Sequence, residues 1–475
     1  MGKLQLEVLS HAEMEKIHAQ TLQILEKVGF RVLDGECQAL LERAGAKIDR
    51  ASDTVYLPPE LVEEALALAP STYELHRIDG QAIEIGGDQH AYMSLVTDPW
   101  IIDYETEKPR RPLLNDVVRH TRLGDALPIV DILYRMDMFV DDVPGEMSYI
   151  RTLEALVTNT TKHLTALPAS IGSIHDWLEI AEILAGDQPL SRRPILSFGV
   201  TATSPLMFTD INAEVLKACT GAGLPILSVD CPMAGTTSPL SFAGTLLVSN
   251  CECVFLIVMA QLMNPGTPIT YGSGQSLTDL HSGFNIYYNA DKMLWKVADK
   301  QMGRFYNVPV TGEWGGSMGG RYDFQSGVES TLLMLASAAT GQHIRAGLGS
   351  CYNANGMSAE FMMIQAEVAE LLERLCQGID TSDNMLGYES IIAAGAGGHF
   401  LEDPLTIQML RSGEFYTGGS FDRLGERSGN DPRHAILTRA HERVEALLGA
   451  HVPAVTDKTI EEIGRWARRK EGAIG

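Results

Sequence analysis

Cysteines and nucleotide-binding motifs are scarce in this sequence. Its seven cysteines are an odd number spread over 475 residues, which is typical of reduced thiols and excludes a dense disulfide framework. The chain has no Gly-x-Gly-x-x-Gly after a first strand and no Gly-x-x-x-x-Gly-Lys-Ser/Thr loop. Hydride transfer and phosphoryl transfer from a P-loop therefore have little support.

Basic residues are also few. The chain has 37 Lys and Arg against 61 Asp and Glu, a formal net charge of −24, which argues against a nucleic-acid surface. The first residues lack the apolar core of a signal peptide, so we expect a cytoplasmic protein. The longest apolar run, Leu240–Met263, is interrupted by Ser249, Asn250 and Glu252. We therefore expect a buried helix there and no membrane span.

Metal-ligating residues do not cluster in the sequence. Cys251 and Cys253 have no third thiol or histidine at ligand spacing, so we interpret them as structural. The segment from Asp279 through His281 to Gly283 is similar to the cobalamin-binding pattern Asp-x-His-x-x-Gly, but its glycine comes one residue early. We expect neither a metal ion nor a tightly bound corrinoid in this chain.

Short apolar runs, each followed by a helical pattern, repeat from about Asp125 onward. We expect strands near 129–139, 163–167, 195–202, 225–231, 268–273, 308–313 and 343–350. Seven such units predict a parallel sheet, and closure at eight strands gives the α/β class with a (β/α)8 TIM-type barrel. The eighth strand is either Tyr92–Thr97 or Ser390–Ala394.

The elements outside this repeat are expected to cover the barrel. Residues 1–124 are predicted to form a helical and mixed cap, 125–402 the barrel, and 403–475 C-terminal helices packed on it, all in one catalytic unit. The first helix has a clear start, because Ser10 and Glu13 have the spacing of a capping box.

The glycine-rich stretch Thr311–Ser330 follows one of the predicted strands. Reacting groups in α/β barrels lie at the carboxyl ends of the strands, so we expect this stretch at the active site. Its glycines allow positive φ and the close approach of a flat ligand, and its aromatic and acidic residues could surround a cation. The alternative is that the glycines only make a turn and the aromatics only cover the rim.

Several segments resemble the trimethylamine methyltransferase family, in the branch without pyrrolysine. They include Leu57–Leu66, Met233–Pro239, Pro265–Pro268 and the spaced residues from Asp323 to Glu329. The resemblance covers nearly the whole chain. It implies a barrel that moves a methyl group from a methylated amine to the Co(I) of a separate, cognate corrinoid protein.

The resemblance also bears on the substrate. In the trimethylamine enzymes the glycine-rich region carries pyrrolysine, whereas Gly316–Tyr322 here contains only ordinary residues. This difference favours a quaternary amine, with glycine betaine first and proline betaine, carnitine or choline-like amines behind. A quaternary nitrogen leaves as a neutral tertiary amine, so no general acid is needed and no catalytic residue is assigned. Orientation in a dry site would suffice.

The resemblance and the expected strand ends together suggest candidate site residues. The candidates for an aromatic cage are Trp314, Tyr271, Tyr322 and Phe324, and the candidate counter-charge is Glu313. The candidates for the carboxylate of a betaine are His343, Arg345 and Arg321. The candidates for the face toward the corrinoid are Gln275, Tyr352 and Asn353. A structural role is the alternative for the cage and counter-charge candidates, and His343 and Arg345 could both face the helices instead.

Two other functions stay open at this level. The chain could demethylate another N-methyl compound, or it could be a cytoplasmic betaine-binding protein without turnover. A homo-oligomer is expected from base rates alone. The acidic composition suits either docking of a corrinoid protein with basic patches or simple solubility.

Overall fold

The computed structural model describes residues 6–136, 139–412, 415, 419–422 and 435–474. An eight-stranded parallel sheet lies at its centre, in the order β15-β13-β11-β10-β9-β6-β19-β18. These strands are β6 (Ala91–Leu95), β9 (Val130–Met136), β10 (His163–Leu167), β11 (Leu196–Val200), β13 (Ile226–Ser228), β15 (Ile269–Thr270), β18 (Thr311–Glu313) and β19 (Ile344–Leu348). A parallel bridge between Tyr271 and Val310 joins the two edges. The predicted (β/α)8 barrel is confirmed.

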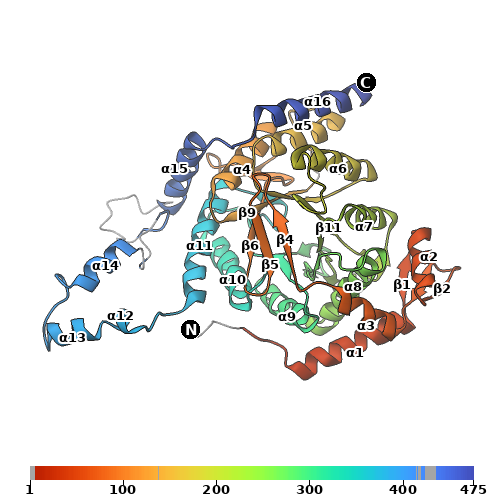
Figure 1. Cartoon of the computed structure of the whole chain (residues 1–475), viewed down its shortest axis with the longest axis horizontal. Coiled ribbons are helices and arrows are strands. Elements are labelled where there is room, and N and C mark those ends of the chain that lie inside the picture. Colours follow the sequence, from red (N-terminus) through yellow and green to blue (C-terminus); the bar gives the residue numbers. More distant parts are fainter. Residues whose placement is uncertain (1–5, 137–138, 413–414, 416–418, 423–434, 475) are drawn as a thin grey trace.

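Eight helices surround the strands (Figure 1). They are α4 (Leu114–Ala126), α5 (Gly145–Val157), α6 (Ile171–Ala185), α7 (Asp210–Ala222), α8 (Phe242–Met263), α9 (Lys292–Phe305), α10 (Phe324–Thr340) and α11 (Ala359–Gln377). Among the described residues, α8 is the helix long and apolar enough to cross a membrane, but 78% of its apolar window is buried inside the protein. It is a core helix, as its polar interruptions predict.

The eighth strand is β6, which pairs with β19 on one side and β9 on the other. The other candidate, Ser390–Ala394, lies in the helix α13 (Tyr388–Ala394). The stretch 1–124, which we expected to form a cap, therefore contributes a barrel strand. The strand-to-helix rhythm is hidden there, because the strands β7 (Trp100–Ile102) and β8 (Pro109–Arg110) intervene before α4.

A hairpin closes the amino-terminal end of the barrel. Its strands are β4 (Thr72–His76) and β5 (Ala82–Gly86), which pair in antiparallel register. Tyr73, Leu75 and Ile85 form one buried apolar cluster with inward-facing strand residues such as Ala91 and Ile344. The barrel interior is thus plugged with apolar side chains at this end, and its space lies at the carboxyl ends of the strands.

The N-terminal elements pack against α8. The helices α1 (His11–Lys27), α2 (Gly35–Arg43) and α3 (Pro59–Leu68) accompany a small sheet of β1 (Phe30–Val32), β2 (Lys47–Asp49), β3 (Thr54–Tyr56) and β12 (Met207–Phe208). Ser10 and Glu13 form the predicted capping box at the start of α1. Phe30 stacks on Phe255 of α8 with ring centroids 3.8 Å apart.

Short strands build the rim at the carboxyl ends. One small sheet joins β7 and β8 to β20 (Ser350–Cys351) and β21 (Gly356–Met357), and another contains β14 (Met233–Ala234), β16 (Ser276–Thr278) and β17 (Asn285–Ile286). Each small sheet draws its strands from two separate segments of the chain. The rim is therefore a paired framework on which the site can be positioned.

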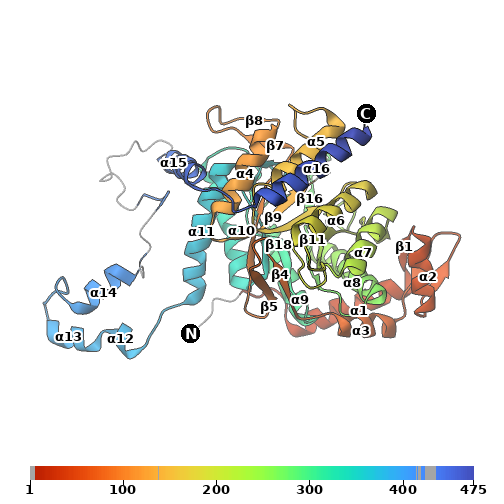
Figure 2. The same cartoon turned by 45° about the horizontal axis from the view of Figure 1, so that its top comes forward.

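The C-terminal helices divide into two groups. The helices α15 (Ala435–Ala450) and α16 (Asp457–Ile474) pack back on the barrel, against α4 and α11 and against α5 and α6 (Figure 2). The helices α12 (Asp383–Leu386), α13 and α14 (Pro404–Ser412) form an arm that extends away from the barrel. None of the residues in these three helices is buried.

A buried carboxylate of α8 makes the stability of the fold depend on pH. Glu252 accepts hydrogen bonds from the Ser204 hydroxyl (2.8 Å) and the Leu206 amide (3.0 Å). Burial, reinforced by the charge of Asp230, raises the pKa of Glu252 to about 8. The folded pKa lies above the unfolded one, so the stability contribution is complete below about pH 4 and is lost as the pH rises through 8.

We therefore predict that Glu252→Gln flattens this pH dependence. Between pH 5.5 and pH 8.5 the free energy of unfolding of the wild type should fall by on the order of a few kcal/mol more than that of the variant. Denaturant unfolding at the two pH values measures this difference. The exposed Glu105→Gln is the control and should follow the wild type. Parallel profiles for all three proteins would contradict the prediction.

Candidate active site

A cavity of about 340 Å³ opens at the carboxyl ends of the barrel strands. Its aromatic lining is Tyr134, Tyr287 and Tyr288, and its acidic lining is Asp98 and Glu313. Small residues such as Gly199, Ser228 and Ala346 make up much of the remaining wall. Among the described residues that line this barrel cavity there is no Lys, Arg or His. The cavity is therefore suited to a small cation.

Glu313 belongs to a buried ion cluster beside the cavity. Its carboxylate lies 3.2 Å from the ammonium nitrogen of Lys292 and 2.6 Å from that of Lys296, and it accepts a hydrogen bond from the Tyr287 hydroxyl. Burial alone would raise the pKa of Glu313, but the two lysines outweigh burial and lower it. Burial lowers the pKa of Lys292 to about 8 against the opposing charge of Glu313.

The segment between β17 and α9 positions the two tyrosines. The Asn353 side chain accepts from the Tyr287 amide at 2.7 Å, and the Tyr288 hydroxyl donates to Ser350 at 3.0 Å. The Lys292 ammonium lies 3.2 Å from the centroid of the Tyr287 ring, a cation–π contact. Both rings are thus fixed from several directions before any ligand binds.

Two glycines make room for these rings. At Gly316, whose φ is +137°, a Cβ atom would lie 2.1 Å from the Cζ atom of Tyr288. At Gly274, a Cβ would lie 2.4 Å from the Tyr287 hydroxyl oxygen. The flat group that approaches the glycine-rich stretch is therefore a ring of the protein itself.

Asp98 is the second carboxylate of the cavity, and its surroundings differ from those of Glu313. It follows β6 at the carboxyl end of the barrel and is only 1% exposed. Neither of its carboxylate oxygens has a hydrogen-bond partner in the described structure. Burial raises the pKa of Asp98 well above its ordinary value.

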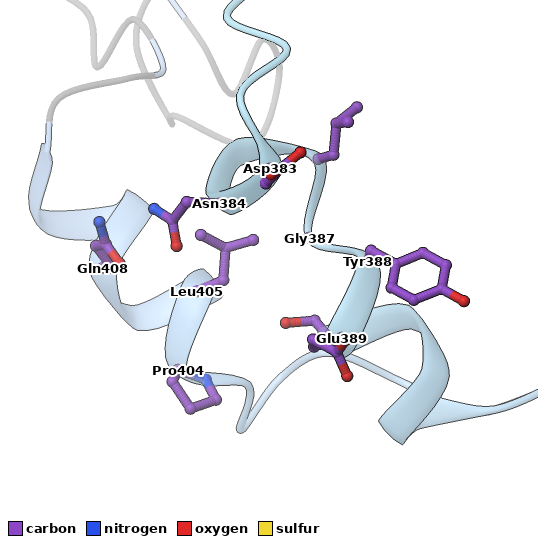
Figure 3. Close-up of a pocket in the computed structure, with 10 residues that line it drawn as sticks. Asp383, Asn384, Gly387, Tyr388, Glu389, Pro404, Leu405 and Gln408 are labelled. Atoms are coloured by element: carbon purple, nitrogen blue, oxygen red, sulfur yellow. The ribbon is translucent and has the colours of Figure 1, made fainter.

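A second hollow, of about 510 Å³, lies on the arm (Figure 3). Asp383, Asn384, Tyr388 and Leu405 are among its lining residues. The three helices that form it contain no buried residue, and it is remote from the strand ends. It offers no fixed groups for chemistry, so the barrel cavity is the candidate site.

The sequence of this chain matches one family over almost its full length. Residues 2–475 match the family described as trimethylamine methyltransferase (MTTB). The chain belongs to this family. It is 29% identical over 468 residues to a glycine betaine methyltransferase of Desulfitobacterium hafniense, with 97% of this chain and 96% of that protein covered. A trimethylamine methyltransferase MttB of the same species is 28% identical, with 85% and 82% covered. The chain is thus a methyltransferase.

Two solved structures of a monomethylamine methyltransferase have a fold similar to that of this chain. The Methanosarcina barkeri enzyme MtmB aligns with a TM-score of 0.52 and 14% identity, covering 93% of this chain and 88% of that one. The hydroxylamine complex of MtmB aligns with a TM-score of 0.54 and 12% identity, covering 94% and 90%. At such low identity the likeness shows the barrel fold alone.

Two of the candidate residues from the sequence line the cavity of the methyltransferase. Glu313 faces inward from β18, and Asn353 lies in the wall near the mouth. Their assigned roles, counter-charge and corrinoid-facing residue, stay predictions. Glu313 is already balanced by two lysines, so it is not a free partner for a substrate cation.

Trp314 and Tyr271, two of the predicted cage rings, do not line the cavity. Trp314 follows the inward-facing Glu313, so alternation along the chain turns it outward. It is fully buried against the edge of Tyr92 and under the Arg345 guanidinium. The Tyr271 hydroxyl donates to Asn250 of α8, at 2.9 Å.

His343 and Arg345 lie on the helix-facing side of the barrel, the alternative that the strand pattern left open. The Val310 amide donates to the His343 ring at 2.8 Å, and Lys300 of α9 also contacts that ring. Arg345 pairs with Glu373 of α11. Neither side chain lines the cavity.

The remaining candidates also lie outside the cavity lining. The Tyr322 hydroxyl bonds to Ser358 and its ring stacks on Phe361, Phe324 is 88% exposed, and Arg321 is exposed. Gln275 donates to Ser249 and Asp299, and Tyr352 packs edge-on against Trp100. The structure places these five side chains outside the cavity, and their predicted roles stay predictions.

The sequence reasoning missed Tyr287, Tyr288, Tyr134 and Asp98. Asp98 had a usable signal, because it follows one of the two candidate eighth strands directly. The tyrosine pair precedes α9 in a segment without helical or strand periodicity. Gly315–Gly319 also has the spacing Gly-x-Ser-x-Gly, but the Ser317 hydroxyl donates to the Gly319 carbonyl instead of to a histidine.

We predict that Gly316→Ala displaces the Tyr288 ring. The added Cβ overlaps that ring, and the backbone conformation is one that alanine avoids, so the free energy of unfolding should fall by roughly 2–5 kcal/mol. Thermal denaturation and ligand affinity measure the effect. Gly319→Ala is the matched control in the same loop, because its nearest neighbour is 3.6 Å away. Equal stability of the two variants would refute this account of Gly316.

Proposed function

We propose that this methyltransferase moves a methyl group from a quaternary amine to the Co(I) of a cognate corrinoid protein. The observation that carries the proposal is the barrel cavity, which is lined by three tyrosines and an unpaired carboxylate and by no basic side chain among the described residues. Aromatic faces and carboxylates are the partners available to a cation without N–H groups. The family membership supplies the reaction class.

The reaction makes few chemical demands on the protein. The bond between a methyl carbon and nitrogen breaks, and its electron pair stays on nitrogen, which leaves as a neutral tertiary amine. Co(I) supplies the electron pair of the new carbon–cobalt bond and becomes Co(III). No proton is transferred, so the reaction requires no general acid.

The residues of this chain would bind, orient and desolvate the amine. The apolar plug of the hairpin blocks water from the amino-terminal end, and the tyrosines are held in place around the cavity. A methyl group directed toward the mouth would meet the corrinoid protein there. Holding both reactants in line in a dry site is an effective way to lower such a barrier.

The substrate within this class has two main candidates. Glycine betaine, which would give dimethylglycine, is suggested by the name of the relative at 29% identity. Choline-like amines, with proline betaine and carnitine, are the alternative. We expect a cytoplasmic enzyme that uses the corrinoid protein as a partner, and a net charge of −24 suits a partner with basic patches. A homo-oligomer remains a base-rate expectation.

The proposal is tested by mixing the purified protein with Co(I) corrinoid protein and single methylated amines while recording the visible spectrum. We expect the spectrum of methyl-Co(III) with at least one quaternary amine and not with trimethylamine. Free Co(I) cobalamin is a second acceptor. Tight amine binding without any methyl-Co(III) would favour the non-catalytic binding protein instead.

We predict that Tyr288→Leu weakens quaternary-amine binding by about 3- to 30-fold, the loss of one cation–π partner. Tyr288→Phe keeps the ring, so it should bind nearly as well as the wild type. Calorimetric titration gives the affinities, and Tyr388→Leu on the exposed arm is the control. If Tyr288→Phe lost as much affinity as Tyr288→Leu, the hydroxyl and not the ring would be the binding group.

A further inference from the structure

Asp98 differs from the other buried carboxylates around the cavity. Glu313 is paired with Lys292 and Lys296, Asp299 accepts from Gln275 and Ser273, and Asp230 accepts from Ser228 and a backbone amide. Of these four carboxylates, Asp98 alone has both oxygens without a partner among the described residues, and it is 1% exposed. A buried polar group without a partner is costly, so such a group points to a ligand.

Asp98 borders two spaces. The smaller one also contains His120, whose Nδ1 atom has no hydrogen-bond partner among the described residues, and the larger one is the barrel cavity. No Lys, Arg or His lines the cavity among the described residues, and Lys292 and Lys296 are already engaged by Glu313. Asp98 lies close enough to Tyr288 to affect the pKa of its hydroxyl group. Burial is the main cause that raises this pKa, and the charges of Glu313 and Asp98 raise it further. A carboxylate and an aromatic ring thus flank the same space, and that space lacks a positive charge.

A second unpartnered group lies in the same wall. The side-chain oxygen of Asn285, on β17, is buried and accepts no hydrogen bond. Asn285 also lines the cavity. The amide oxygen accepts hydrogen bonds, so a hydroxyl donor on the ligand would satisfy it.

We infer that Asp98 is the counter-ion of the substrate nitrogen and that the substrate is a choline-like cation, with a hydroxyl and without a carboxylate. The inference rests on the proposed function and specifies its substrate. In a betaine the carboxylate lies a few ångströms from the nitrogen and would bring a second negative charge beside Asp98, whereas Glu313 is already compensated by its two lysines. At an effective dielectric constant of about 20, this repulsion is worth about 10- to 100-fold in affinity.

The test compares choline with glycine betaine, which share the trimethylammonium group, by calorimetric titration of wild type and Asp98→Asn. We expect the wild type to bind choline at least 10-fold more tightly than glycine betaine. Asp98→Asn should lose at least 10-fold in choline affinity and little in betaine affinity, so the preference should collapse. The exposed Asp187→Asn is the charge-matched control and should keep the wild-type preference for choline over glycine betaine.

The Asn285 contact is tested separately with tetramethylammonium, which has no hydroxyl. Asn285→Ala should weaken choline about 3- to 10-fold and leave tetramethylammonium unchanged. If Asn285→Ala still bound choline more tightly than tetramethylammonium by the wild-type ratio, Asn285 would not be the group that contacts the hydroxyl. Asn replaces Asp98 without a change of shape and removes a buried charge, so melting temperature should show that the Asp98→Asn variant folds.

The outcomes separate this inference from the proposed function. Formation of methyl-Co(III) from glycine betaine but not from choline would leave the function standing and overturn the inference. A choline-to-betaine preference that Asp98→Asn does not change would also overturn it. Absence of both binding and methyl transfer with every amine would overturn both.

Discussion

The ion cluster of Glu313 with Lys292 and Lys296 is the constraint on which the rest of the site depends. It ties β18 to α9 inside the barrel, and the Tyr287 hydroxyl donates to the same carboxylate. A buried ion pair of this kind contributes little net stability but strongly penalises the loss of one partner. The cluster therefore fixes geometry, and it keeps one of the two carboxylates of the cavity from acting as an open charge.

The contrast between Glu313 and Asp98 explains how a cavity lined by ordinary residues can select a cationic ligand. Both carboxylates line the same cavity, but Glu313 is paired with two lysines, whereas Asp98 has no hydrogen-bond partner among the described residues. Since the tyrosines are held by Asn353 and Ser350, the cavity need not be assembled when the ligand arrives. Preorganised sites of this kind gain affinity by avoiding ordering costs.

The sequence predicted the barrel, but it indicated few of the residues that line the cavity, for a physical reason. Seven apolar runs at regular spacing identify a parallel barrel without any knowledge of side-chain direction. A site residue depends on the phase of each strand, and a step of one residue moves a side chain to the other face. The prediction chose Trp314 along with Glu313, although only Glu313 faces inward. Tyr287 and Tyr288 lie in a segment without helical or strand periodicity, so the sequence does not indicate which way their side chains point.

The close contact between Gly316 and the Tyr288 ring links two positions 28 residues apart. Because the ring fills the volume that a side chain at 316 would occupy, each position limits what the other can hold. A larger residue at 316 would therefore need a smaller residue or a displaced ring at 288.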